Sequence, residues 1–284
     1  MSATLDLDAL VKPLPFWSPK AWYYAAARGL IGSVGRLSKG IRLGLERGFD
    51  SGVMLDYVYE NRPQGSGRVG RAIDGLFLEA PGWRGIRNRG RLLEEKIAGA
   101  VRAAAPRRRP VRLADLACGG GRYVLGALKS VGEAVPVEAV LRDYRRENVD
   151  KAAANAAALG LDVRVEQADA FADHQLARLA PVDLAVVSGL HEIVPDDARI
   201  EARFGQVASI LAPGGRLLLT VQPDHPQLEF IARVLRSHTG RPWAMRLRPL
   251  ETTLRWIEAA GLVPESVDME PLGIFGVVSA RKAG

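Results

Sequence analysis

Cysteine is almost absent from this chain. Its 284 residues include a single cysteine, Cys118. One thiol excludes an intramolecular disulfide and fits a reducing compartment. At the N-terminus, Asp6 and Asp8 precede the first basic residue, Lys12. A secretion signal needs a basic segment ahead of an apolar run, so none is predicted and we expect a cytoplasmic protein.

Long apolar runs are also missing. The most apolar N-terminal stretch, residues 22–34, is too short to span a bilayer and contains Arg28. No internal repeat or low-complexity tract is present. A hydrophobic content of 48% and a charged content of 25% are ordinary for a soluble globular protein with a sizeable core. The length suits one domain of about 200 residues with a smaller appendage.

Acidic residues are scarce in the first part of the chain. Residues 1–110 hold 19 Lys and Arg against 10 Asp and Glu, a net charge of +9. Residues 111–284 hold 20 against 22, a net charge of −2. This asymmetry indicates either an anionic partner for the first part, such as a membrane surface, a nucleic acid or an acidic substrate, or an ordinary solvated basic surface.

The basic first part is predicted to be helical. Over residues 15–50, apolar positions recur at helical spacing, but frequent glycines favour a broken pair of helices over a single long one. Residues 63–67 should form a loop, residues 69–78 and 88–105 further helices, and residues 107–110 a linker. We therefore expect a helical region over residues 1–95 that covers the substrate as a lid, followed by a second domain over residues 96–284.

From Val111 onward, short apolar runs alternate with amphipathic segments. This pattern predicts an α/β fold, a parallel sheet with helices on both faces. The predicted strands are 111–116, 137–141, 163–167, 182–187 and 216–220, and the predicted helices 122–131, 147–159, 174–179, 198–211, 226–237 and 252–260. Residues 212–215 should turn into the fifth strand, and the runs 264–269 and 273–280 could form a terminal hairpin.

A glycine-rich turn follows the first strand, in the segment Asp115-Leu116-Ala117-Cys118-Gly119-Gly120-Gly121. Small residues there allow a sharp turn and bring the backbone close to a ligand. The next helix points its free N–H groups at that ligand. By itself, such a turn could also be no more than a tight connection.

Polar residues near the ends of the next three strands strengthen the binding interpretation. Asp143 lies 22 residues after Gly121, which suits a hydrogen bond to a ribose diol. Asp169 could meet an adenine edge, and Ser188 opens the segment after the fourth strand. The carboxyl ends of the strands meet at one crevice. The predicted cofactor contacts are Asp115, Ala117, Cys118, Gly119, Gly121, Asp143, Tyr144, Asp169, Ala170 and Ser188, with Cys118 a small filler and not a nucleophile.

The type of nucleotide follows from what the turn lacks. A dinucleotide fingerprint needs a third glycine where this chain has Val124, and no Gly-Lys-Ser/Thr marks a P-loop. The spacing Asp-x-Ala-x-Gly-x-Gly instead resembles the first motif of class I S-adenosylmethionine-dependent methyltransferases, although many members carry glycine in place of Ala117. The resemblance implies a Rossmann-like sheet, S-adenosylmethionine as cofactor, Asp143 at the ribose and Asp169 beside adenine.

A narrower resemblance extends over nearly the whole chain. It is to one bacterial group of methyltransferases whose members occur alone or fused behind an α/β-hydrolase domain. The segments that carry it are 37–42, 55–59, 81–87, 142–144 and 222–229. It supports the cofactor and leaves the acceptor open.

Candidate residues for contact with the methyl acceptor follow the fourth strand. His191 could take a proton from an acceptor hydroxyl or amine, or could only pack, and Glu192 could hold an acceptor ammonium group, or could be a solvated acid. The predicted substrate contacts are His225, after the fifth strand, and Tyr57, Tyr59 and Asn61 in the N-terminal part, whose aromatic faces could attract a cation. No metal ligand is predicted.

Several functions stay open. The first is methyl transfer to a small molecule or a lipid head group, with the basic helices touching a membrane surface. The second is attack on the aminobutyryl chain of the cofactor, which releases methylthioadenosine, and the third is a non-catalytic cofactor-binding module. Nucleic-acid methylation is not expected, because the fourth strand is not followed by Asn/Asp-Pro-Pro-Tyr/Trp and no RNA-binding module is recognised. The sequence does not indicate an oligomeric state.

Overall fold

The computed structural model describes residues 7–105, 109–179 and 181–284. Residues 1–6, 106–108 and 180 lie outside this range, and these include half of the predicted linker, residues 107 and 108. The chain divides into two compact units, Met1–Arg87 with Asp224–Leu247, and Asn88–Pro223 with Arg248–Gly284. Across the described residues, no helix combines the length and the apolar character needed to cross a membrane.

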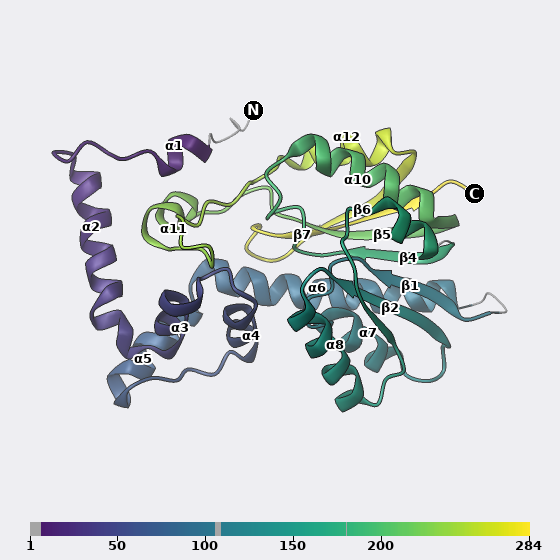
Figure 1. Cartoon of the computed structure of the whole chain (residues 1–284), viewed down its shortest axis with the longest axis horizontal. Helices are drawn as coiled ribbons and strands as arrows, with labels where there is room; N and C mark the ends of the chain where they lie inside the picture. The colour runs from purple at the N-terminus through teal and green to yellow at the C-terminus, as the bar shows by residue number, and fades with distance from the viewer. Residues whose placement is uncertain (1–6, 106–108, 180) are drawn as a thin grey trace. The chain divides into compact units, whose positions relative to one another are not determined.

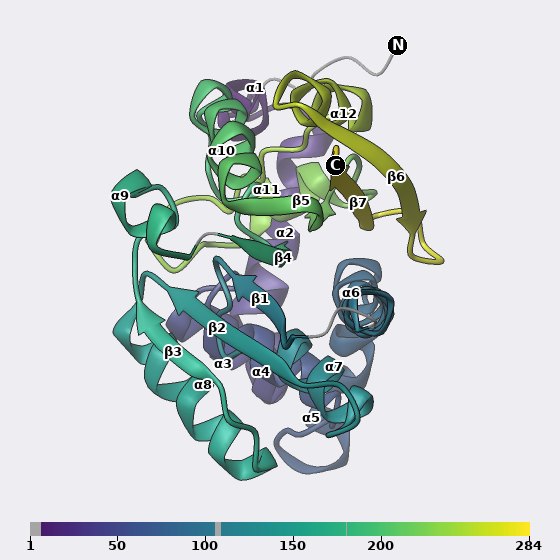
Figure 2. The same cartoon turned by 90° about the vertical axis from the view of Figure 1, so that its right-hand side faces the viewer.

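The second unit is built on a seven-stranded sheet of order β3-β2-β1-β4-β5-β7-β6 (Figures 1 and 2). The first five strands are parallel, and β7 is antiparallel to both of its neighbours. The order reverses between β1 and β4, so a crevice is expected outside their carboxyl ends. The strands are β1 Val111–Asp115, β2 Val137–Asp143, β3 Arg164–Gln167, β4 Val182–Val187, β5 Leu211–Val221, β6 Leu262–Met269 and β7 Gly276–Lys282.

Helices cover both faces of this sheet, as predicted (Figure 2). One core joins the strands to α6, α7 and α8 through residues such as Leu93, Leu125 and Ala152. The other joins them to α10 and α12 through Phe204, Val207 and Ile257. All six residues of β4 are buried, as expected for a central parallel strand. The helices are α6 Pro81–Ala104, α7 Arg122–Val131, α8 Arg146–Leu159, α9 Asp173–Leu176, η2 Ala177–Leu179, α10 Asp197–Ile210 and α12 Leu250–Ala259.

Two details of the sheet bear on the sequence predictions. The terminal hairpin exists, as β6 and β7. The predicted turn at residues 212–215 is an irregularity inside β5, whose pairing with β4 shifts between Val182 and Leu184. Gly214 has a φ of 69° there, a backbone conformation that glycine adopts without steric cost.

The first unit is helical, and the predicted break in residues 15–50 is confirmed. Buried Asp74 organises this unit: its carboxylate accepts hydrogen bonds from the Ser38 and Tyr57 hydroxyls and from the backbone N–H of Gly40 and Gln64. The elements are α1 Leu7–Val11, α2 Pro19–Gly32, η1 Val34–Leu37, α3 Lys39–Arg47, α4 Gly52–Glu60, α5 Gly67–Leu78 and α11 Leu228–Val234, with the first turns of α6.

The division into units differs from the predicted boundary at residue 95. It falls inside α6, between Arg87 and Asn88, and it assigns residues 224–247 to the first unit. The helix predicted over 226–237 is therefore the shorter α11, which packs with α1 and α2 within the first unit. Sequence periodicity detects such a helix but not the element on which it packs.

Candidate active site

The glycine-rich turn joins β1 to α7 and is fixed to both neighbouring strands. The Leu116 N–H donates to the carbonyl of Val186 on β4, at 3.0 Å. On the other side, the Cys118 N–H donates to the carbonyl of Arg142 on β2, at 2.9 Å. The turn therefore lies at the carboxyl edge of the sheet, where the strand order reverses.

Two glycines in the turn are needed for different reasons. Gly121 begins α7 with a φ of 74°, and a Cβ there would lie 2.7 Å from Leu141 Cδ2 and 3.0 Å from Leu125 Cδ1. Gly119 also has a positive φ, 55°, but a Cβ there would meet no atom within 4 Å. Gly121 thus allows close packing, whereas Gly119 borders open space beside its backbone.

Asp143, at the end of β2, connects the turn to α8. Its Oδ2 accepts a hydrogen bond from the Gly119 N–H at 2.9 Å. Its Oδ1 accepts from the Arg145 N–H and the Asn148 side chain, both at 2.9 Å. A carboxylate offers about four acceptor positions, so about one remains for a ligand hydroxyl.

Asp115 and Cys118 are buried within the turn. The pKa of Asp115 is raised to about 7, mainly by burial. The Ala117 N–H, which donates to Asp115 Oδ1 at 3.3 Å, lowers this pKa, and the charge of Asp143 raises it. Burial also raises the pKa of Cys118, which keeps its sulfur as a thiol. A nucleophilic cysteine requires a lowered pKa, so Cys118 acts as packing.

The remaining predicted cofactor residues follow β2 and β3. Tyr144 is exposed, and its carbonyl accepts from the Gln167 amide at 3.1 Å. Asp169 is also exposed, and its Oδ1 accepts from the Phe171 N–H at 2.9 Å, which shapes the loop after β3. Ala170 is buried. The pairing of β2 with β3 in parallel places these residues at the same edge as Asp143.

Polar side chains gather where β4 and β5 end. The Gly189 N–H donates to Thr220 Oγ1 on β5 at 2.9 Å, and that hydroxyl donates to Glu192 Oε1 at 3.3 Å. Ser188 Oγ, His191 Nε2 and Glu192 Oε2 are shielded from solvent, and the described residues offer them no hydrogen-bond partner. Buried polar atoms are normally paired, so these three atoms point to a ligand or water near the end of β4.

Burial raises the pKa of Glu192, partly offset by the positive charge of Arg89. Arg89 itself is buried, and its guanidinium donates to the Tyr123 hydroxyl at 3.3 Å and lies 4.9 Å from the centre of the Phe275 ring. A carboxylate with a raised pKa is a stronger base than an exposed glutamate. The arrangement therefore suits proton removal from a bound group.

His191 is packed away from solvent. Its ring meets that of Phe204 at 5.2 Å in an edge-to-face arrangement, and its carbonyl accepts from the buried Arg248 guanidinium. Burial lowers the pKa of His191 to about 3, with the charges of Arg248 and Arg203 acting in the same direction. The imidazole is therefore neutral near pH 7 and a weak base, which favours the packing role over the predicted proton transfer.

The predicted substrate residues all belong to the first unit. The Tyr57 hydroxyl donates to Asp74, and Asn61 ends α4 in the left-handed conformation, with a φ of 47°. Tyr59 donates to the Ile86 carbonyl at 3.5 Å. His225 is buried, its Nδ1 accepts from the Gln227 N–H, and burial lowers its pKa to about 4. Their contact with a substrate remains a prediction.

Three site residues were not predicted from the sequence. Thr220 is the last residue of the strand predicted over 216–220, and Tyr123 follows the glycine turn by two residues, so position along the predicted elements could have indicated both. Arg89 is one of several arginines on a long helix, and nothing in the sequence distinguishes it from its neighbours.

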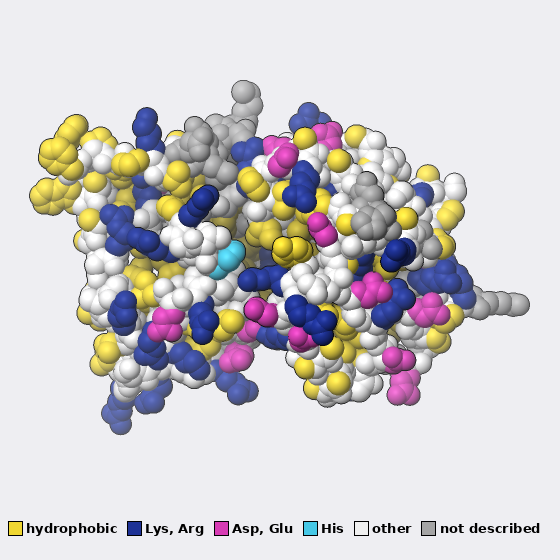
Figure 3. Space-filling view, in the orientation of Figure 1, with side chains coloured by type: hydrophobic (Ala, Val, Ile, Leu, Met, Phe, Trp, Pro, Cys, Tyr) yellow, Lys and Arg dark blue, Asp and Glu magenta, His cyan; other side chains and the backbone are white. Residues whose placement is uncertain are grey.

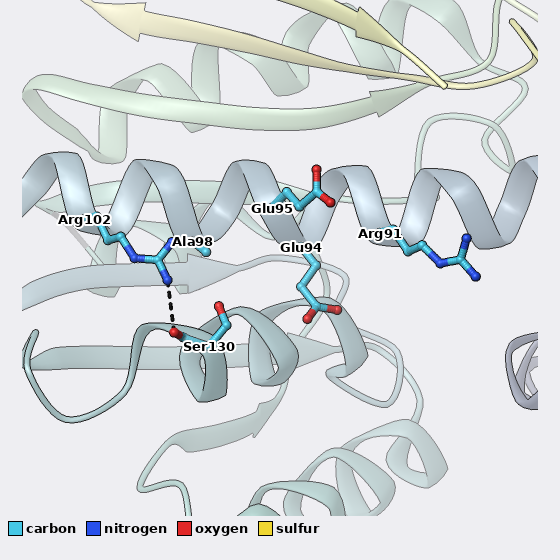
Figure 4. A pocket seen from close by; sticks show the side chains of 6 residues that line it. All are labelled: Arg91, Glu94, Glu95, Ala98, Arg102 and Ser130. Carbon is cyan, nitrogen blue, oxygen red and sulfur yellow. Dashed lines mark hydrogen bonds between the residues drawn. The ribbon is translucent and has the colours of Figure 1, made fainter. Parts of the chain in front are cut away.

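A pocket of about 300 Å³ lies elsewhere on the second unit (Figure 4). It is lined by side chains of α6 and the last turn of α7: Arg91, Glu94, Glu95, Ala98, Arg102 and Ser130. Ser130 lies nine residues after Gly121, roughly 13 Å along the helix axis. This pocket is therefore distinct from the crevice at the glycine turn.

The donors and acceptors of the crevice fit S-adenosylmethionine. Gly119 leaves room beside its backbone, and Asp143 keeps an acceptor position for a ribose hydroxyl. Asp115 and Asp143 together favour a cationic ligand, and S-adenosylmethionine carries a sulfonium and an ammonium group. The N-terminus of α7, where the helix dipole is positive, is suited to a carboxylate.

Comparison with known proteins shows the family to which this chain belongs. A family profile described as "Putative methyltransferase" matches residues 2–282. This chain belongs to that methyltransferase family. It is also 41% identical over 272 residues to "Uncharacterized protein YnbC" of Escherichia coli (strain K12), a match that covers 94% of this chain and 46% of the relative. The chain thus spans about half the length of that relative.

Solved structures share the fold. A possible exported protein from Bordetella parapertussis matches with a TM-score of 0.63 at 20% identity, over 94% of this chain and 100% of that one. Magnesium protoporphyrin IX methyltransferase from Synechocystis PCC 6803, with bound S-adenosylhomocysteine, matches with a TM-score of 0.57 at 14% identity, over 92% and 99%. The predicted methyltransferase family and the Rossmann-like fold class are confirmed, and the cofactor remains a prediction.

Proposed function

We propose that this chain transfers the methyl group of S-adenosylmethionine to a small molecule or a lipid head group, with Glu192 as the base. The observation that carries the proposal is the shielded carboxylate of Glu192, whose Oε2 has no partner among the described residues. Glu192 follows the end of β4 by five residues, and β4 pairs with β1 directly ahead of the glycine turn. Family membership supports methyl transfer as the reaction.

Bound S-adenosylmethionine would supply a methyl group activated by its sulfonium, so the protein would mainly align the acceptor and exclude water. A lone pair of the acceptor would form the new bond to the methyl carbon as the carbon–sulfur bond breaks and its electron pair goes to sulfur. A hydroxyl or amine acceptor must also lose a proton, and Glu192 Oε2 can take it. Thr220 fixes the other carboxylate oxygen at 3.3 Å and so orients this base.

Arg89 and Ser188 complete the surroundings of Glu192. The charge of Arg89 opposes the effect of burial on the Glu192 pKa and so favours the ionised form of the carboxylate. Ser188 Oγ, shielded and without a partner in the described part of the chain, can donate to an acceptor oxygen. These groups fit an acceptor with a polar, ionisable end, which a small metabolite or a lipid head group would provide.

Product analysis tests the proposal. The protein is incubated with S-adenosylmethionine labelled in its methyl group and a fractionated extract of bacterial metabolites and lipids. We expect S-adenosylhomocysteine and a labelled acceptor in equal amounts. Methylthioadenosine as the product would instead mean attack on the aminobutyryl chain, and cofactor binding with no product from any fraction would indicate a binding module.

A further inference from the structure

Large aromatic side chains protrude from the first unit at the start of α2. Phe16, Trp17, Trp22 and Tyr23 are 79%, 71%, 69% and 59% exposed. Figure 3 shows hydrophobic side chains protruding where Figure 1 draws the turn between α1 and α2, with Lys and Arg side chains nearby. Single exposed hydrophobic residues are ordinary, but four large aromatics within eight residues mark an interaction surface.

The outer face of α2 is apolar along its length. Trp22, Ala25, Ala26, Gly29 and Leu30 follow the i, i+3, i+4, i+7, i+8 spacing of one helix face, and all five are exposed. A surface helix normally carries charged or polar residues on such a face. This helix therefore has one side on the protein and a second apolar side without a partner in the described part of the chain.

The two charged residues of α2 face the protein. Lys20 forms an ion pair with Glu229 of α11 at 2.7 Å, and Arg28 donates to the Arg233 carbonyl at 2.8 Å. Buried Tyr24 packs between them against Phe230, with ring centres 6.4 Å apart. These contacts fix the orientation of α2, so its apolar face is held outward.

Contacts within this segment also satisfy the polar group of an exposed aromatic side chain, which lowers the cost of entering an apolar environment. The Trp22 indole N–H donates to the Phe16 carbonyl at 2.6 Å. Phe16 and Trp17 pack edge to face, with ring centres 4.8 Å apart. Trp22 therefore carries no unsatisfied donor into lipid, where an unpaired polar group is costly.

The charge around this surface determines the type of partner. Residues 9–45 contain six Lys and Arg and no Asp or Glu. A second copy would bring the same positive segment opposite this one, and like charges repel. An anionic partner is attracted instead, and the aliphatic part of the face, Leu30 and Val34, suits acyl chains better than stacked bases.

We infer that residues 16–34 form a docking surface for an anionic lipid bilayer. The aromatic side chains would enter the interface between head groups and acyl chains, where Trp and Tyr are enriched in membrane proteins. The surrounding Lys and Arg, including Lys12 and Arg36, would meet the phosphates of the head groups. This surface shares no residue with the proposed methyl-transfer site, so it can be tested independently of the proposed function.

Vesicle flotation tests the inference directly. The whole chain is mixed with vesicles of phosphatidylcholine alone, or of phosphatidylcholine with phosphatidylglycerol. We expect binding to the anionic vesicles that weakens as salt is added, together with a blue shift of tryptophan emission. The double variant Trp17→Ser/Trp22→Ser should bind about tenfold or more weakly. Because both side chains are exposed, its circular dichroism spectrum and melting temperature should match the wild type.

The matched control is Leu76→Ser on α5, since Leu76 is 78% exposed but outside the surface. It should bind vesicles like the wild type. The inference is overturned if the wild type does not bind anionic vesicles, or if the double variant binds equally well. It is also overturned if the emission does not shift, or if sedimentation shows a dimer that the double variant abolishes.

Discussion

Single substitutions in the glycine turn can distinguish its role in core packing from its role in cofactor binding. In Gly121→Ala, the new Cβ would lie 2.7 Å from Leu141 Cδ2 on a backbone with a φ of 74°. A left-handed conformation costs a non-glycine residue about 1–2 kcal/mol, and overpacking a core adds about 1–3 kcal/mol. We therefore expect the free energy of unfolding to fall by about 2–5 kcal/mol, a large share of the stability of an ordinary domain.

Gly119→Ala should behave differently. Its backbone also has a positive φ, 55°, but the new Cβ would meet no protein atom within 4 Å. Only the conformational cost of about 1–2 kcal/mol applies to stability. Because that Cβ would point into the space we assign to the cofactor, binding of S-adenosylmethionine should weaken by on the order of tenfold or more.

Gly160→Ala is the matched control. Gly160 ends α8 with a φ of 66° and open space around it, so it shares the backbone cost without bordering the crevice. Urea unfolding followed by circular dichroism gives the stabilities, and calorimetry gives the affinities. If Gly119→Ala binds the cofactor as tightly as Gly160→Ala does, our placement of the cofactor is wrong. If Gly121→Ala is no less stable than Gly119→Ala, the packing argument fails.

Three further predictions concern single side chains. Glu192→Gln should lower kcat by about 10²–10⁴-fold, the usual contribution of a general base. The control Glu201→Gln, on the exposed side of α10, should leave kcat unchanged. If kcat is the same in Glu192→Gln and in the wild type, Glu192 is not the base. His191 has its pKa lowered to about 3, so it stays neutral in the folded state while the unfolded chain binds a proton below about pH 6.5. The stability that the neutral imidazole contributes is present above pH 6.5 and is lost as the pH falls towards 3, by up to about 5 kcal/mol. In His191→Gln, the free energy of unfolding measured in urea should therefore fall less between about pH 6.5 and pH 3 than in the wild type. An equal fall in both proteins would contradict the buried, neutral state of His191. Asp143→Asn should weaken cofactor binding measured by calorimetry and lower stability by about 1.5–3 kcal/mol, because it removes a charged acceptor from three hydrogen bonds; full affinity in this variant would contradict the ribose assignment.

Much of the second unit could be predicted from its sequence. Central strands such as β4 are continuous apolar runs, and the helices between them keep a clear period, so the alternation indicated the sheet and its edge. The glycine turn and Asp143 were found by spacing alone, and the structure joins them through the hydrogen bond from Gly119 to Asp143.

Other features depend on contacts that spacing does not encode. His191 was a plausible base by position, but its neighbours Phe204 and Arg248 are 13 and 57 residues away in the chain, and they determine its pKa. The place of Arg89 in the site could not be predicted for the same reason, because its contacts Tyr123 and Phe275 lie on elements distant in the sequence. The packing of α11 with the first unit likewise depends on long-range contacts.

The central claim is that the crevice at the glycine turn binds S-adenosylmethionine. Calorimetric titration of the wild-type chain with this cofactor tests it most directly, with Gly160→Ala and Gly119→Ala measured in parallel. We predict one molecule bound per chain, affinity retained in Gly160→Ala and affinity reduced in Gly119→Ala. No binding by the wild type, or binding that is unaffected by Gly119→Ala, would contradict the claim.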